Sequence, residues 1–121
     1  MYNFTTPGID PPRPNRISGY AFNATGGLGA GSYFQDPVTA NEWIHFVTVI
    51  NTVSTSSQYP TGYVKIYKNG VLRDQDALAN YNIIPSNTGA PMNIAAASLD
   101  SFFEGRIGRV VLFDYEPTAS S

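Results

Sequence analysis

Two stretches of the chain have the apolar pattern of β-strands. Residues 42–50 are apolar at odd-numbered and even-numbered positions alike, in the order Trp43, Ile44, Phe46, Val47, Val49 and Ile50. β-Branched and aromatic side chains favour strands, and a strand that is apolar on both faces is typical of one covered on both sides. Residues 105–115 contain a second run of this kind, made of Ile107, Val110, Val111, Leu112 and Phe113. The pattern predicts a strand in each stretch.

A hairpin is predicted near the middle of the chain. Val64 and Ile66 alternate with larger polar side chains, which is the period of a strand that buries one face. Asn69-Gly70 follows, and residues 71–72 are apolar again. Asn-Gly between two such runs is the strongest short-range hairpin signal, because both turn positions require a positive φ. We expect a two-residue type I′ turn at this point.

The rest of the chain consists of short strand and turn patterns, with no long helix and no repeat. The proline-rich residues 1–16 predict an irregular or polyproline-like segment with a short strand at 2–5. Residues 74–79 are compatible with one helical turn or with an edge strand. Further strands are expected over 17–22, 32–35 and 92–97, with a glycine loop at 26–31 and a turn at 99–103. Six or seven strands in 121 residues predict a single all-β domain over residues 1–121.

The composition of the chain narrows the classes of function that the protein can have. Charged residues make up 13% of the chain, against about 25% in a typical protein. The net charge is −2 and the basic residues are scattered, which argues against a nucleic-acid partner. No apolar run is long enough to span a membrane, and the N-terminus lacks the pattern of a signal peptide. The absence of cysteine excludes disulfides and thiolate chemistry.

The sequence predicts a protein that is not an enzyme. His45 is the single histidine, and a catalytic histidine works with a positioned carboxylate and a nucleophile. We interpret it as a hydrogen-bonded histidine of the sheet. Two pairs of neighbouring acids, Asp74/Asp76 and Asp114/Glu116, are interpreted as solvated carboxylates, not as the pair of a glycoside hydrolase.

No cofactor is expected, with a structural calcium ion as the one alternative. Calcium takes six to eight oxygen ligands, and Asp36, Asp74 and Asp76 are the candidate donors. The chain has no Asp-x-Asp-x-Asp-Gly loop of the EF-hand type.

Four segments follow one another in the order and at the spacing of a known family: residues 42–47, 62–72, 90–94 and 103–110. Together, over roughly residues 41–118, the chain resembles the laminin-G-like modules of the concanavalin A-like lectin/glucanase superfamily. The resemblance implies an antiparallel β-sandwich or jelly roll and a lectin-like recognition role at the cell surface or outside the cell. The chain departs from the pattern at Ala95, where the family has glycine, and at Gly108-Arg109, where it has acidic residues.

The resemblance also implies an incomplete sandwich. Only 42 residues precede Trp43, whereas family modules have several more strands there. A half-built sandwich leaves an apolar face and open strand edges that a soluble protein has to cover. We expect the cover to be a second copy of the chain, giving a homo-oligomer, or a longer parent chain. The alternative is that residues 1–35 complete a smaller sandwich.

Aromatic and polar side chains are the candidate ligand-binding residues: Tyr20, Tyr33, His45, Tyr63, Lys65 and Tyr67. Sugars bind to flat aromatic faces with a few placed polar groups around them, while Trp43 is expected to lie in the core. The leading hypothesis is a non-catalytic carbohydrate-binding module with a glycan as partner. The alternatives are a structural module that assembles with itself and, less favoured by the residues, a glucanase-type hydrolase.

Overall fold

The computed structural model describes residues 2–4, 13–23, 28–83, 92–94, 96–97 and 101–118. By its contacts the chain divides into two compact units, Met1–Pro85 and Ser86–Ser121. The elements are β1 (Tyr2–Phe4), β2 (Arg13–Arg16), β3 (Ser18–Phe22), β4 (Gly29–Tyr33), β5 (Phe46–Asn51), β6 (Tyr63–Lys68), β7 (Val71–Ala77), the 3-10 helix η1 (Leu78–Tyr81), β8 (Ala96–Ala97) and β9 (Ser101–Phe102). All strand pairs are antiparallel, which confirms the predicted fold class.

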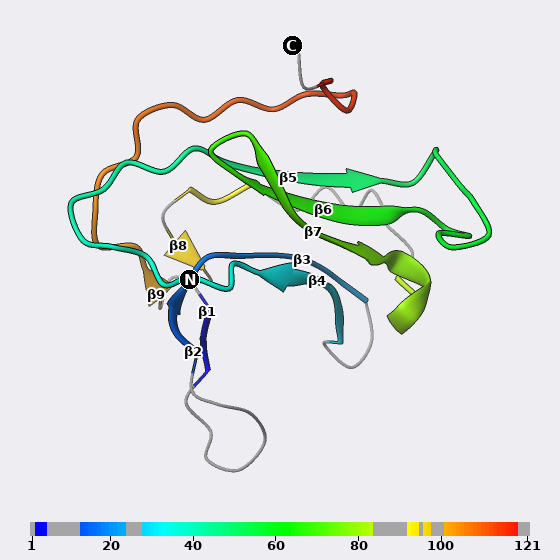
Figure 1. Ribbon diagram of the computed structural model, residues 1–121, viewed down its shortest axis with the longest axis horizontal. Coiled ribbons are helices and arrows are strands. Elements are labelled where there is room, and N and C mark those ends of the chain that lie inside the picture. The colour runs from blue at the N-terminus through cyan, green and yellow to red at the C-terminus, as the bar shows by residue number, and fades with distance from the viewer. Residues whose placement is uncertain are drawn as a thin grey trace. The chain divides into compact units, whose positions relative to one another are not determined.

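The first unit is built on a three-stranded sheet in the order β5-β6-β7 (Figure 1). The predicted hairpin is confirmed: Asn69 and Gly70 connect β6 to β7 with φ angles of 52° and 80°, the two positive values that a type I′ turn requires. Tyr67 pairs with Leu72 but Ile66 pairs with Asp74. The residue between them, Arg73, is therefore the extra residue of a β-bulge.

The β3–β4 hairpin forms a second layer against this sheet (Figure 1). A Cβ added to Gly19 would lie 2.7 Å from Cγ2 of Ile66 and 2.8 Å from Oγ1 of Thr48, so the two layers are in close contact. The strand predicted over 32–35 is β4, which begins earlier, at Gly29, and ends at Tyr33. A Cβ added to Gly29 would lie 2.8 Å from the Phe22 ring, so the glycine in the strand gives that ring its space.

The core lies between these two layers. Its buried side chains are those of Ala30, Phe34, Val64, Ile66, Leu78 and Ile83. Residues 74–79 contain both predicted alternatives, because β7 continues to Ala77 and η1 begins at Leu78. The carboxylate of Asp76 joins β7 to β4, since its Oδ2 accepts the Gly31 N–H at 3.0 Å.

The prediction for residues 42–50 is wrong in three respects. The strand begins at Phe46, and Trp43 is 68% exposed instead of belonging to the core. Phe46 pairs with Lys68, the last residue of β6 before the turn. Residues 42–45 therefore extend past the end of the hairpin and pair with none of the described strands. The predicted burial of both faces is also wrong for β5, because Ile50 on this edge strand of the described sheet is 50% exposed.

The proline-rich segment is more regular than predicted. β1 and β2 pair, with Tyr2 opposite Arg16 and Phe4 opposite Arg13. Pro14 is tolerated in β2 because a strand with one neighbour needs only half of its N–H groups for pairing. Residues 5–12 lie outside the described part.

In the described residues of the second unit there is one short strand pair, β8 with β9. The strand expected over 105–115 is absent from the described strands, and its apolar side chains are exposed, as with Leu112 at 75%. An apolar pattern supplies a face for burial, but a strand also needs a neighbour for its backbone hydrogen bonds. Among the described residues of the strand predicted over 92–97, only Ala96 and Ala97 form a strand. Leu99 and Asp100 of the predicted turn lie outside the described residues. None of the described helices is long and apolar enough to cross a membrane.

Candidate functional site

The structure separates the six predicted binding residues. Val64 and Ile66 of β6 are buried, so by alternation Tyr63, Lys65 and Tyr67 lie on the outer face of the three-stranded sheet. In the β3–β4 layer the inward positions are taken by residues such as Gly19 and Ala30. Tyr20 and Tyr33 therefore lie on the other outer face of the first unit, away from the tyrosines of β6.

Tyr63 is engaged in packing. It is 9% exposed, and the Tyr59 ring meets its own ring edge-on at 5.5 Å. Lys65 Nζ lies 4.5 Å from the ring centroid, and Asn51 Nδ2 donates to the hydroxyl at 3.1 Å. The residue anchors the loop after β5 onto the sheet, and its ring is not available to a sugar in this arrangement.

His45 lies on an exposed segment that is held to the β6–β7 turn by two hydrogen bonds. The His45 N–H donates to Asn69 Oδ1 at 2.9 Å, and the Asn69 N–H donates to the His45 carbonyl at 2.8 Å. Trp43 precedes His45 by two residues and is 68% exposed. The segment before β5 thus presents an indole and an imidazole on a backbone fixed to a tight turn, and the turn itself adds the carboxamide of Asn69.

Sequence reasoning missed the exposure of Trp43, although a signal was present. The Asn69-Gly70 turn marks the end of the hairpin. Aligning residues 42–50 antiparallel to β6 would have shown that the first of them extend past this end. Apolar character alone favours the core for tryptophan.

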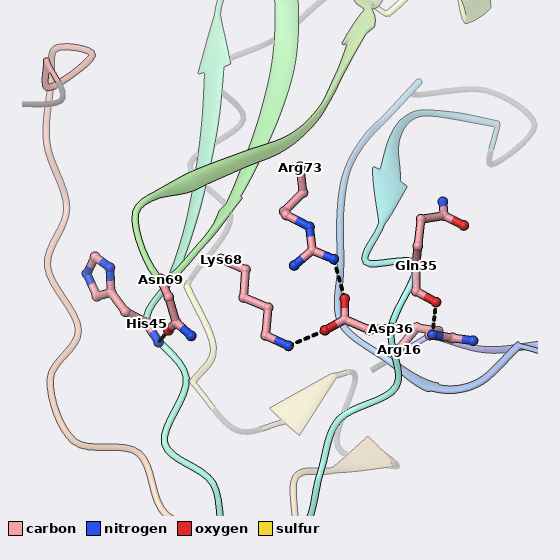
Figure 2. A network of polar contacts seen from close by, with 7 residues as sticks. All are labelled: Arg16, Gln35, Asp36, His45, Lys68, Asn69 and Arg73. Atoms are coloured by element: carbon pink, nitrogen blue, oxygen red, sulfur yellow. Dashed lines mark hydrogen bonds and ion pairs between the residues drawn. The ribbon is translucent and has the colours of Figure 1, made fainter.

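A charged cluster lies at the same end of the sheet. Lys68 Nζ contacts Asp36 Oδ2 at 2.5 Å, and Arg73 is paired with Oδ1 of the same carboxylate (Figure 2). Arg16 Nη1 donates to the carbonyl of Gln35, next to Asp36. We call these residues, Arg16, Asp36, Lys68 and Arg73, the Asp36 cluster. Figure 2 shows the His45 ring on the other side of the hairpin from the Lys68–Asp36 pair.

An aromatic base positions the cations of the cluster. The Phe34 ring, 1% exposed, has Lys68 Nζ at 5.9 Å and the Arg73 guanidinium at 5.3 Å from its centroid. Phe46 meets Phe34 edge-on at 5.8 Å. The β-bulge places Arg73 on this side. The hydrogen bond from Lys68 is the main cause that lowers the pKa of Asp36 from 3.8 to about 2, so the carboxylate is charged at neutral pH.

The three calcium candidates do not form one site. Asp36 is paired with two cations, Asp76 accepts hydrogen bonds from Gly31, Ala77 and Asn80, and Asp74 accepts the N–H of Gln75. Among the described residues, no three His, Asp or Glu side chains gather as metal ligands. A calcium ion bound elsewhere stays a prediction.

Comparison with known proteins identifies one family. A model described as the concanavalin A-like lectin/glucanases superfamily, of laminin-G type, matches residues 12–121. The match begins well before residue 41, where the sequence resemblance begins, and so includes the β3–β4 layer. No curated protein and no solved structure matches the chain.

Proposed function

Because the chain belongs to the concanavalin A-like lectin/glucanase superfamily, we propose that it is a non-catalytic recognition module that binds carbohydrate outside the cell. The observation that carries the proposal is the 68% exposure of Trp43 on a segment fixed by the reciprocal hydrogen bonds between His45 and Asn69. A large aromatic side chain is costly to leave in water, and its exposure on a held backbone fits a ligand platform.

The chemistry of this segment suits a sugar. An indole face packs against the apolar face of a pyranose ring, while nearby polar groups orient the hydroxyls. Asn69 uses its Oδ1 for the His45 N–H, so its two Nδ2 hydrogens are left to donate. The His45 imidazole is exposed and offers a further donor and acceptor.

We expect Trp43→Ala to weaken glycan binding at least about tenfold, since exposed aromatic anchors dominate small interfaces. Trp43 is the only tryptophan, so its fluorescence reports the site directly. A panel of neutral oligosaccharides titrated into the full chain should change the emission and protect the indole from acrylamide quenching.

The matched control is Tyr81→Ala, which removes an aromatic side chain of the same unit that is 41% exposed and lies on η1. Its glycan affinity should equal that of the original chain. Binding that survives Trp43→Ala, or a panel in which no glycan protects the indole, would exclude this site as the carbohydrate platform.

A second candidate function, self-assembly, is favoured by the free edge of β5. On the side away from β6 this strand pairs with no described strand. It has no charge, proline or bulge, the features that normally keep edge strands apart, and its Ile50 is 50% exposed. The partner proposed for this edge is β5 of a second copy, paired antiparallel around a two-fold axis.

Val49→Glu tests this assembly. Val49 pairs with Lys65 of β6, so a glutamate there has an opposite charge as its cross-strand neighbour within one chain. With the two-fold axis of the dimer at Val49, two copies would instead bring two glutamates together. Light scattering after size exclusion should give about twice 13.1 kDa for the original chain and one chain mass for Val49→Glu. Val53→Glu, at an 88% exposed loop position, should stay dimeric. A monomeric original chain would refute the assembly.

A further inference from the structure

Positive charge is concentrated in the Asp36 cluster. The protein has a net charge of −2 and seven basic residues, yet Arg16, Lys68 and Arg73 all gather around residues 35–36. The cluster has three cations and one carboxylate, which leaves a surplus of two positive charges. Such a surplus in a protein of low charge favours a negatively charged ligand at this point.

Several donors of these cations are unused. The guanidinium of Arg73 has five N–H donors, and within the described part of the chain its one acceptor is Asp36. Arg16 Nε is buried and has no hydrogen-bond partner there. A buried donor without an acceptor is rare in proteins and indicates a missing partner. Arg73, whose side chain is partly exposed, can therefore accommodate further oxygen acceptors.

The cluster is held in place and reaches solvent. Phe34 lies beneath Lys68 and Arg73, and both cations come from the ladder-bonded strands β6 and β7. The side chains of Asp36 and Arg73 are 43% and 27% exposed. A ligand group can therefore reach the guanidinium from solvent without movement of the sheet.

We propose that the Asp36 cluster is a binding subsite for an oxyanion carried by a sugar, either a uronate carboxylate or a sulfate ester. The oxyanion takes the place of the Asp36 carboxylate on Arg73, whose planar fork matches both groups. The proposal that a sugar carries the oxyanion rests on the proposed carbohydrate binding. The proposal that the cluster binds an oxyanion does not. Asp36 acts as an internal competitor that occupies the cations when no ligand is bound.

The first experiment uses inorganic sulfate as the probe for the oxyanion part. The full chain is titrated at constant ionic strength, with chloride as the balancing ion, and followed by amide NMR shifts around residues 35–36. Arg73→Gln should weaken sulfate binding about tenfold or more. Arg109→Gln, the same charge change on the second unit, should leave it unchanged. Lys68→Gln repeats the test if Arg73→Gln does not fold.

Asp36→Asn gives a readout that a purely structural cluster would not show. Removing the competing carboxylate should strengthen sulfate binding about fivefold, because one repulsive charge near the ligand disappears. Equal sulfate affinity in Arg73→Gln and Arg109→Gln, no saturable binding, or weaker binding in Asp36→Asn would each overturn the oxyanion subsite.

A second titration compares glucuronate, glucose 6-sulfate and glucose. The inference expects both acidic sugars to bind at least about tenfold more tightly than glucose, and this preference to disappear in Arg73→Gln. Preference for one acid identifies the source of the oxyanion. Equal binding of all three overturns the inference alone. Sulfate binding without any sugar binding retains the oxyanion subsite and overturns the proposed carbohydrate function.

Discussion

Replacing Gly62 with alanine is expected to lower the free energy of unfolding by at least about 3 kcal/mol. Gly62 has a φ of +102°, and a Cβ there would lie 1.9 Å from the carbonyl oxygen of Asn51. The obstacle is backbone, so the end of β5 has to move away from the start of β6. Backbone strain at such a φ costs about 1–3 kcal/mol by itself. For a domain whose total stability is about 5–15 kcal/mol, this is a large share.

Gly70→Ala separates the two causes. Gly70 also has a positive φ, +80°, but a Cβ there meets nothing within 4 Å. This variant should therefore lose only the conformational part, about 1 kcal/mol. Urea denaturation followed by circular dichroism measures both variants, since the exposed Trp43 is a poor reporter of unfolding. Equal losses in the two variants would show that the contact with Asn51 has no energetic role.

The second large effect is expected for Leu78→Ala. Leu78 is 0% exposed and packs in the core with Ala30, Val64 and Ile83. Its backbone N–H also donates to the Gly62 carbonyl at 3.1 Å, so the side chain fills a site whose walls are fixed. Truncating a buried leucine costs about 2–5 kcal/mol, and more where the walls cannot collapse. Here we expect about 3 kcal/mol.

Leu72→Ala is the matched control for this substitution. Leu72 lies on β7 of the same sheet and is 46% exposed, so its truncation should cost less than about 1 kcal/mol. The same denaturation series gives both values. If Leu72→Ala were as costly as Leu78→Ala, the outer face of the sheet would have to be covered in solution.

The candidate site depends on the same hairpin as the fold. The turn at Asn69-Gly70 ends the pairing of β6, and this leaves residues 42–45 outside the sheet with Trp43 exposed. The bulge in β7 turns Arg73 toward Asp36. The two proposed ligand contacts therefore arise from where the hairpin ends and where its ladder is interrupted.

Local sequence was sufficient for some features of this protein. The type I′ turn followed from Asn69-Gly70, because only residues that tolerate a positive φ occupy it. The buried face of β6 followed from the alternation at Val64 and Ile66, since a strand places alternate side chains on opposite faces. The order of four short motifs was enough to predict the family and, with it, the antiparallel β fold.

Other features were decided only by tertiary structure. Whether residues 42–45 and 105–115 become strands depends on a neighbour for their backbone hydrogen bonds, and neither apolar pattern specifies that neighbour. The approach of Lys68 and Arg73 to Asp36 joins residues 32 and 37 positions apart, with no periodicity to signal it. Of the candidate binding residues, Tyr20 and Tyr33 lie on the outer face of one layer and those of β6 on the outer face of the other, while His45 lies outside both layers. Composition determined which residues could bind a sugar, and strand register determined which of them lie together.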